Sequence, residues 1–433
     1  MRVSTSQIFA SGARGIGSNQ FDLFKLQNQL STGRKILTPE DDPIASAQVL
    51  VLRQSESISA QFLENQQDAQ SKMGIADSQL TSLGDLLQNV RERVIQAGNT
   101  ALSNQDRSYI AQELEGRFSE LMGIANAQDG AGNYLFSGYK GAVRPFSVNT
   151  AGAAYAGDDG SRLMQVGASR QMPTNVSGSK LFENIRNGNG TFATATGGNG
   201  ANINQGTGLI DQGTVNNIGL WNQAVAGGYT NIEIRFSVAA GVTQYQLFDN
   251  SASPAPATAL SAAPFNFASG QSIPLDVRDP LTGNVTQDFG VSVAINGMPA
   301  SGDKFLVSPS ANQSIFTTLR NTINTLTLGI GSAATGNSTT EFVNDLDSSL
   351  QNFDQALENV TQARTTMGSY LKELDSLATT TEDLRLQYSS SLSSLQDLDY
   401  AKAITDLASK KMQLEAAQLS FKQTSQLSLF NIL

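Results

Sequence analysis

The chain has 433 residues, with 28 Lys and Arg against 38 Asp and Glu, so its formal net charge is −10, and it contains neither Cys nor His. The absence of Cys and His excludes thiol nucleophiles, disulfides, Cys/His zinc sites and His general bases. An acidic chain is also a poor ligand for nucleic acid or for an anionic membrane surface, so we expect neither as a partner.

The N-terminus lacks the pattern of a secretory signal peptide. Its only early apolar run, residues 8–10, is too short for the core of such a signal. No stretch approaches the roughly 18 uninterrupted apolar residues of a membrane-spanning helix. Residue chemistry therefore leaves two interpretations open, a cytoplasmic protein or a protein exported without a cleaved signal.

The first 40 residues carry a thin heptad pattern. A heptad has two core positions. One of them is apolar in every repeat, whereas the other is apolar only at Leu26 and is Gly or Asn in the remaining repeats. The regular apolar position is held by Phe9, Ile16, Leu23, Leu30 and Leu37. A helix with so narrow a stripe is marginal in water, so the pattern predicts a helix that needs a partner.

A stronger helical signal follows from Phe62 to Ala97. Apolar residues alternate there at spacings of three and four, as in a buried helix. They are Ala69, Met73, Ala76, Leu80, Leu83, Leu87, Val90, Val94 and Ala97. Ser103 with Asp106 then predicts the capped start of a third helix, and residues 129–132 predict its end.

The C-terminal part of the chain repeats these signals. Residues 338–341 form a predicted capping box, and a long apolar register follows it. The register comprises Leu346, Leu350, Phe353, Leu357, Val360, Met367, Leu371 and Leu374. A last stripe comprises Tyr400, Ile404, Leu407, Leu414, Ala417 and Phe421.

The middle of the chain differs from both ends. Residues from about 140 to 310 are rich in Gly and Pro and contain short alternating runs, such as 232–238, 245–248 and 291–295, which predict β-strands. Residues 186–217 are so rich in Gly, Asn and Thr that they predict long loops.

We therefore predict an α+β protein. Both arms would form one elongated helical bundle or coiled coil, with a β-rich insert domain at its distal end. The predicted division is a terminal coiled-coil region at 1–40 and 400–433, a helical rod at 41–139 and 310–399, and a variable outer β domain at 140–309.

Candidate catalytic patterns are weak. Residues 188–193 match a dinucleotide-binding fingerprint by letter, but they lie in predicted loop sequence and not between a strand and a helix. The paired carboxylates 41–42, 158–159, and Asp397 with Asp399 show no arrangement that predicts a glycosidase. We expect no enzyme, no catalytic residue, no cofactor and no metal.

Several motifs resemble the flagellin superfamily. Residues 30–45 resemble its N-terminal signature, and residues 132–140 are similar to its turn after the third helix. Residues 155–158 resemble the start of its β domain, and residues 427–433 its C-terminal tail. The signature contains Pro39 and Pro43, as in the superfamily's hook–filament junction members, whereas flagellins usually carry a small residue after the Asp-Asp pair.

The resemblance covers about residues 1–180 and 310–433. It implies a structural protein of the bacterial flagellum, exported unfolded without a cleaved signal and located outside the cell as an adaptor between hook and filament. It also implies self-assembly in a ring or helix, a hook-associated neighbour on the hook side, flagellin on the filament side and a cytoplasmic export chaperone at the C-terminal region.

With the heptad patterns, the resemblance predicts an assembly surface on the terminal helices. Its residues are Ile16, Leu23, Leu26, Leu30, Ile404, Leu407, Leu414 and Phe421. Two alternatives stay open: a flagellin-like filament subunit, and a surface adhesin or glycan-active protein that uses Asp158, Asp159 or Asp211 of the insert.

Overall fold

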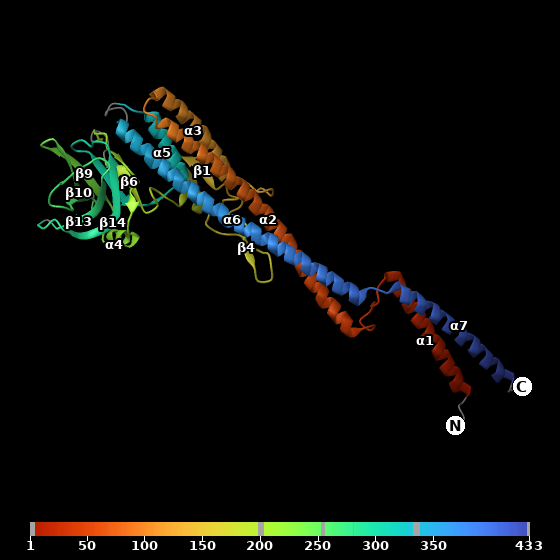
Figure 1. Ribbon diagram of the computed structural model, residues 1–433. Coiled ribbons are helices and arrows are strands. Elements are labelled where there is room, and N and C mark those ends of the chain that lie inside the picture. The colour runs from red at the N-terminus through yellow and green to blue at the C-terminus, as the bar shows by residue number, and fades with distance from the viewer. Residues whose placement is uncertain (1–4, 198–202, 253–255, 280, 332–337, 431–433) are drawn as a thin grey trace. The chain divides into compact units, whose positions relative to one another are not determined.

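Long helices form the N- and C-terminal parts of the described chain, and the β-rich region lies between them in the sequence (Figure 1). The computed structural model describes residues 5–197, 203–252, 256–279, 281–331 and 338–430. The predicted α+β class with helical arms is therefore confirmed. The helices are α1 (Thr5–Thr32), α2 (Pro43–Ala97), α3 (Asn104–Ala125), α4 (Ile218–Ala226), α5 (Ile315–Leu328), α6 (Thr339–Gln396) and α7 (Tyr400–Phe430), with a short π-helical turn η1 (Ser179–Glu183).

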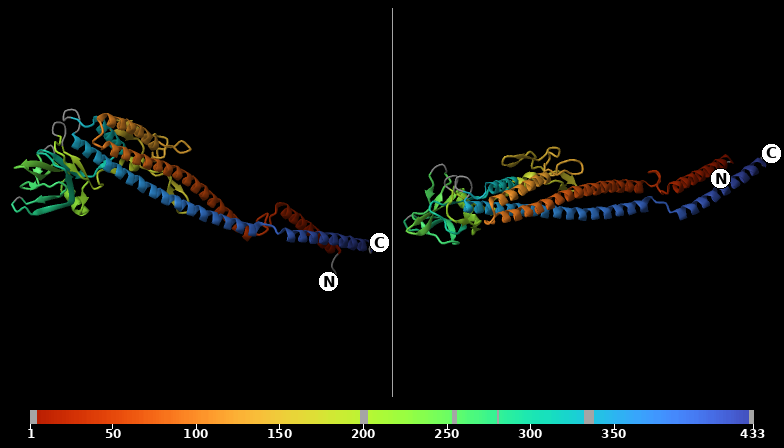
Figure 2. Two further views of the ribbon diagram at one scale, coloured as in Figure 1. Left: turned by 45° about the horizontal axis from the view of Figure 1, so that its top comes forward. Right: turned by 90° about the horizontal axis from the view of Figure 1, so that it is seen from above.

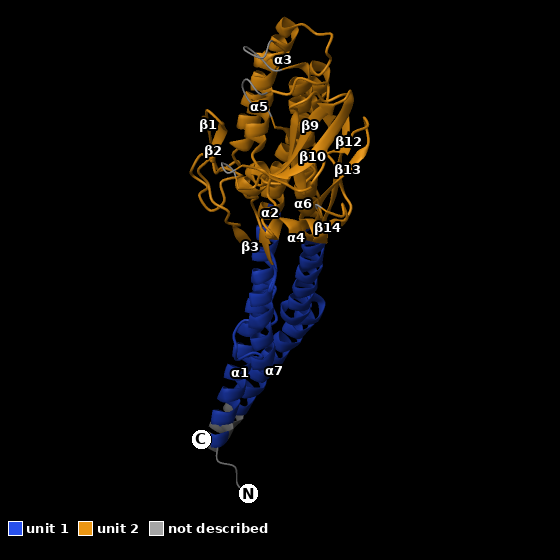
Figure 3. Cartoon of the chain, turned by 90° about the vertical axis from the view of Figure 1, so that its left-hand side faces the viewer, with its two compact units in different colours: residues 1–67, 165–170, 374–433 blue, residues 68–164, 171–373 orange. Residues whose placement is uncertain are grey.

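The chain divides into two compact units (Figure 3). Unit 1 comprises residues 1–67, 165–170 and 374–433, and unit 2 comprises residues 68–164 and 171–373. The divisions fall within the long helices α2 and α6 and not at the predicted limits of a rod.

Helix α2 begins well before its apolar stripe. The Asp42 carboxylate accepts the Ala45 N–H at 2.9 Å, and Pro43 is the first helical residue, where its missing N–H costs nothing. The predicted stripe from Ala69 to Ala97 is buried and is confirmed.

The two predicted capping boxes have different outcomes. At α3, Ser103 and Asp106 form the complete reciprocal box, as predicted. The helix ends at Ala125, however, before the Gly-rich residues that the sequence indicated. At α6, Ser338 Oγ accepts the Glu341 N–H at 3.1 Å. Glu341 Oε2 is buried without a hydrogen-bond partner in the described part of the chain, so only half of this box is supported.

The central region is built mainly from two sheets. One has the order β11-β10-β9-β15-β6 with β12 beside β10, and the other has the order β13-β14-β7 with β8 beside β14. All the pairings are antiparallel. The strands are β6 (Phe192–Thr196), β7 (Leu209–Ile210), β8 (Thr214–Val215), β9 (Ile232–Ala239), β10 (Val242–Asp249), β11 (Thr258–Ala259), β12 (Phe265–Asn266), β13 (Ser272–Arg278), β14 (Val285–Asn296) and β15 (Lys304–Pro309).

Three further two-stranded pairs lie in the described residues. They are β1 (Phe146–Asn149) with β2 (Gly152–Tyr155), β3 (Leu163–Gln165) with β4 (Gln171–Pro173), and β5 (Ile185–Arg186) with β16 (Asn312–Gln313). The three runs that predicted strands lie in β9, β10 and β14, so these predictions are confirmed.

The prediction of long loops at 186–217 is partly wrong. Strand β6 falls in this segment and pairs with β15 from Phe192 to Thr196. Residues 198–202 lie outside the described residues. Phe192 of β6 is buried in the core of the β region. Its ring centroid lies 5.6 Å from that of Trp221, the chain's single Trp. Tertiary burial here overrides weak local propensity.

Polar side chains of α6 fix the β region to the helix. Asn344 accepts the Ile210 N–H at 2.9 Å and donates to the Gly208 carbonyl at 3.2 Å. Asn352 accepts the Gly188 N–H at 2.9 Å. These amides satisfy backbone groups of the irregular segment, which would otherwise be buried without partners.

Candidate assembly interface

Helices α1 and α7 lie side by side in all three views of Figures 1 and 2 and run antiparallel within unit 1. At one end, the Phe9 and Phe421 rings meet edge to face with centroids 5.6 Å apart. Further along, Lys410 Nζ lies 2.8 Å from Asp22 Oδ2. The terminal helices α1 and α7 therefore pack against each other within one chain.

The contact between α1 and α7 is narrow. A Cβ at Gly12 would lie 2.8 Å from the Phe421 ring, so this glycine lets the ring lie against the α1 backbone. Ala403 is the single described α7 residue in the buried class, at 4% exposed. Most of the predicted surface is half-buried, namely Ile16, Leu23, Leu26, Leu30, Leu407, Leu414 and Phe421.

Among the α7 residues of the predicted assembly surface, Ile404 differs from the others because it does not face α1. Its side chain is 57% exposed, because the contact with α1 follows residues 403, 407, 410, 414, 417 and 421. One residue is about 100° around a helix, so Ala403 and Ile404 cannot both point at α1. Ile404 is therefore free for a partner other than α1.

Sequence reasoning missed other exposed apolar residues on the same helices. Phe21 and Phe24 of α1 are 68% and 60% exposed, and Met412 and Leu419 of α7 are 69% and 61% exposed. These residues fall between the heptad positions. A search for a second apolar stripe on each helix would have found them.

Half of the exposed large hydrophobic side chains among the described residues lie in unit 1, which holds fewer than a third of the chain. Concentrations of exposed apolar side chains mark protein contacts. Unit 1 is therefore the candidate assembly interface.

The two connections next to α1 and α7 are joined to each other. The Lys35 N–H donates to the Gln396 carbonyl at 2.7 Å, and the Leu398 N–H donates to the Gly33 carbonyl at 3.0 Å. Gly33 has φ +69°, and a Cβ there would lie 2.8 Å from the Tyr400 hydroxyl. We call residues 33–42 and 397–399 the joint.

The Asp-Asp pair of the N-terminal signature holds the joint. Asp41 Oδ2 accepts the Leu37 and Thr38 N–H groups at 2.8 and 3.0 Å, and Lys25 Nζ lies 2.6 Å from Asp41 Oδ1. The hydrogen bond from Lys25, with those from the backbone, lowers the pKa of Asp41 to about 2. The signature is therefore a local fold, in which Asp41 closes the loop and Asp42 caps α2.

The carboxylates considered for catalysis have structural partners. Asp158 Oδ1 accepts the Tyr139 and Gly160 N–H groups, and these bonds lower its pKa. Asp159 accepts the Ser177 and Ser179 hydroxyls. Asp211 Oδ1 accepts the Gly213 and Ala294 N–H groups.

The carboxylates near the joint are engaged in the same way. Asp397 accepts the Ser393 hydroxyl, and Asp399 accepts the Lys402 N–H at 3.1 Å. Within the described ranges no cluster of three or more acidic side chains could hold a metal ion, and no helix is long and apolar enough to cross a membrane.

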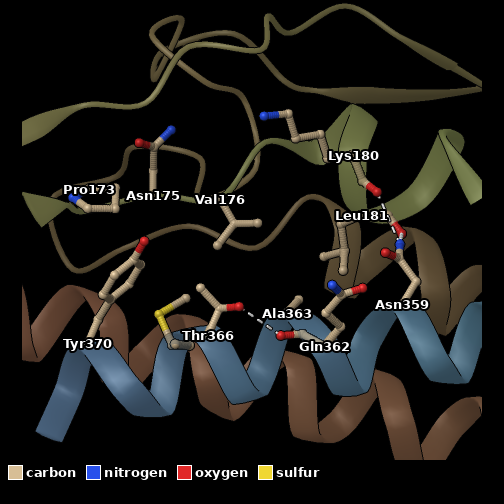
Figure 4. A pocket seen from close by; sticks show the side chains of 11 residues that line it. Pro173, Asn175, Val176, Lys180, Leu181, Asn359, Gln362, Ala363, Thr366 and Tyr370 are labelled. Atoms are coloured by element: carbon tan, nitrogen blue, oxygen red, sulfur yellow. Dashed lines mark hydrogen bonds between the residues drawn. The ribbon is translucent and has the colours of Figure 1, made fainter.

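Unit 2 contains an apolar cavity of about 250 Å³ between α6 and residues 173–181 (Figure 4). Val176, Leu181 and Met367 contribute apolar side chains to it. Asn359 on its wall donates to the Lys180 and Leu181 carbonyls, both at 3.0 Å, so this amide fastens the segment to α6. Nearby, Leu135 and Phe136 are buried, and the Phe136 and Phe182 rings meet with centroids 5.4 Å apart.

The two helical arms match known protein families. Residues 3–141 match the bacterial flagellin N-terminal helical region, and residues 350–433 match the bacterial flagellin C-terminal helical region. The chain belongs to the bacterial flagellin family. The match covers α1, α2, α3 and α7 and most of α6, so it includes the candidate interface.

Individual relatives resemble this chain over different lengths. Flagellar hook-associated protein 3 of Salmonella typhimurium is 36% identical over 185 residues, which are 43% of this chain and 58% of that protein. Flagellin of Bacillus subtilis is 28% identical over 180 residues, which are 41% of this chain and 56% of that protein. The matched region thus spans little more than half the length of these curated relatives.

A solved structure matches more completely. The flagellar junction protein FlgL from Legionella pneumophila aligns with a TM-score of 0.64 and 26% identity over 81% of this chain and 99% of that one. The fold of this chain is therefore that of a flagellar junction protein.

Proposed function

We propose that this chain is a structural adaptor of the bacterial flagellum that joins the hook to the flagellin filament, and that it is not an enzyme. The observation that carries the proposal is the α1–α7 pair, an antiparallel contact that leaves apolar side chains exposed on both helices. Similarity to hook-associated protein 3 and to a solved flagellar junction protein supports the same role.

The assembly mechanism follows from the narrow contact. One chain buries little beyond Ala403 on α7, so the pair gains limited stability by itself. Neighbouring subunits would cover the exposed faces and convert half-buried contacts into a closed core. Assembly would therefore order the terminal helices. Loss of the apolar residues between α1 and α7 would prevent the chain from docking on its neighbours.

The proposed partners are other copies of this chain, a hook-associated neighbour and flagellin. We place the assembled protein outside the cell. It would be exported without a cleaved signal, and a cytoplasmic chaperone would bind its C-terminal region before export. For the predicted domains, we retain terminal assembly segments at 1–40 and 400–433 and a variable outer β region at 140–309.

A flagellin-like filament subunit is the main competing function. Higher identity to hook-associated protein 3 than to flagellin, 36% against 28%, favours the junction role. The Pro39 and Pro43 signature agrees with this assignment.

Electron microscopy of cells that lack this chain tests the proposal. We expect hooks without filaments and flagellin released into the medium. Filaments of normal length attached to hooks would contradict an adaptor role. Loss of flagellin itself from both cells and medium would contradict it in favour of a regulatory effect.

A further inference from the structure

Charge is unevenly distributed within unit 1. The terminal segments 1–40 and 400–433 contain nine Lys and Arg against four Asp and Glu. The neighbouring parts of unit 1 on α2 and α6, residues 41–67 and 374–399, contain two Lys and Arg against nine Asp and Glu. A basic helix pair and an acidic helix pair therefore follow each other along one unit.

The acidic part has an exposed apolar residue next to two carboxylates. Leu386 of α6 is 68% exposed. Glu382 and Asp383 are also exposed and precede Leu386 by four and three residues, so they lie beside it on the helix surface. Neither carboxylate forms an ion pair within the described part of the chain.

The basic part has the opposite arrangement. Leu419 of α7 is 61% exposed, and exposed Lys422 follows it by three residues. Ile404, 57% exposed, has exposed Lys411 seven residues further along the same face. Both lysines lack ion-pair partners among the described residues, and this face of α7 points away from α1.

We propose that the outer face of α7, formed by Ile404, Lys411, Glu415, Leu419 and Lys422 and carrying two lysines against one carboxylate, docks on the acidic outer face of α6 around Leu386 in a second copy of this chain. The inference rests on the proposed function and specifies one of its contacts. Complementary charge selects the register and speeds the encounter, and the apolar residues supply buried area.

The two faces cannot meet within one copy. Helices α6 and α7 extend to opposite sides of the joint in Figures 1 and 2, and both faces belong to unit 1. Because the two surfaces differ, the contact is head-to-tail, and each copy offers one of each. Such a contact propagates into a ring if the rotation closes and into a helix if it does not.

Disulfide trapping tests the proposal, because the native chain has no Cys. We expect Leu386→Cys/Leu419→Cys, produced in place of the native chain, to give a ladder of covalent oligomers when flagella are isolated and oxidised. Each single variant should stay monomeric on the same non-reducing gel. Leu386→Cys/Gln413→Cys is the matched control, because Gln413 is exposed on another face of α7, and it should give no ladder.

A charge exchange provides the second readout. Lys422→Glu should reduce the cross-linked fraction at least tenfold, and Asp383→Lys in the same chain should restore it. Protein present in isolated flagella without a ladder, or without restoration by the exchange, would overturn the α7–α6 contact and leave the adaptor function standing. Protein absent from isolated flagella would overturn both.

Discussion

Gly33 shows how one residue shapes the joint. Its backbone has φ +69°, and the Tyr400 hydroxyl occupies the space that a side chain would need. A side chain would meet both a strained backbone and a steric clash. The sequence presents this residue only as a weak position in a heptad, whereas the fold makes it the contact point of two connections.

We expect Gly33→Ala to destabilise the joint by about 1 kcal/mol or more, because alanine disfavours positive φ and its Cβ approaches Tyr400. Hydrogen exchange at the Lys35 and Leu398 amides measures the effect and should accelerate. Gly74→Ala, in the interior of α2 with nothing within 4 Å of the added Cβ, is the control and should be neutral or stabilising. Unchanged exchange in Gly33→Ala would contradict the predicted strain.

A second residue-scale prediction concerns Asp345 of α6. Burial and then the nearby Glu341 carboxylate raise its pKa from 3.8 to about 6. The folded state thus binds the proton more tightly than the unfolded state, so stability from this group is present below pH 4 and is lost as pH rises from about 4 to about 6.

Asp345→Asn removes this cost. We expect the variant to gain on the order of 1–2 kcal/mol at pH 7.5, allowing for partial exposure of the carboxylate, and little at pH 4. Urea unfolding followed by circular dichroism at both pH values measures the difference. An equal gain at the two pH values would show that the effect is not electrostatic.

At the scale of elements, apolar side chains of α2 are buried in one part of the helix and exposed in another. Leu83 is fully buried in the stripe of unit 2, whereas Leu50 in unit 1 is 70% exposed. The same substitution can therefore have a large effect at one position of this helix and a small effect at another. The α6 register behaves similarly, because Phe353 is fully buried and Leu357 is half-buried.

We expect Leu83→Asp to lower the free energy of unfolding by about 3 kcal/mol or more, because the carboxylate would be buried without a partner. Fluorescence of Trp221, together with circular dichroism, reports the unfolding of unit 2. Leu50→Asp on the same helix is the matched control and should change stability by about 0.5 kcal/mol or less. Equal effects would show that the register of α2 is wrong.

At the scale of the whole molecule, the residues of the main cores differ from those of the proposed assembly surface. The core of the β region surrounds Trp221, and the α2 stripe lies in unit 2, whereas the narrow α1–α7 contact lies in unit 1. Segments with few buried contacts open locally without global unfolding.

We therefore expect Leu407→Asp/Leu414→Asp to abolish attachment to the hook. The unfolding midpoint followed by Trp221 fluorescence should equal that of the native chain within error. Both leucines are half-buried against α1, and assembly would bury the new carboxylates at about 2 kcal/mol or more each. The amount of secreted protein is measured as well, because failure to attach must be distinguished from failure of export. A secreted, folded variant that still supports filaments would show that this seam is not the joining surface.

The sequence by itself determined the helical arms, the α3 cap, the buried face of α2 and the strands β9, β10 and β14. These features follow from apolar period and from side chains that cap their own neighbours, both of which act over a few residues. The resemblance to flagellins likewise rested on short signatures, and the family match supports it.

Only the tertiary structure decided which residues are shared between distant segments. The face of α7 that meets α1 contains Ala403 and excludes Ile404, and β6 forms inside a segment whose composition predicted loops. The Gly33–Tyr400 approach joins positions on different helices, as does the Asp22–Lys410 pair. Each outcome depends on a partner more than 100 residues away, and the energy of burial against that partner exceeds the small local preferences that a sequence pattern records.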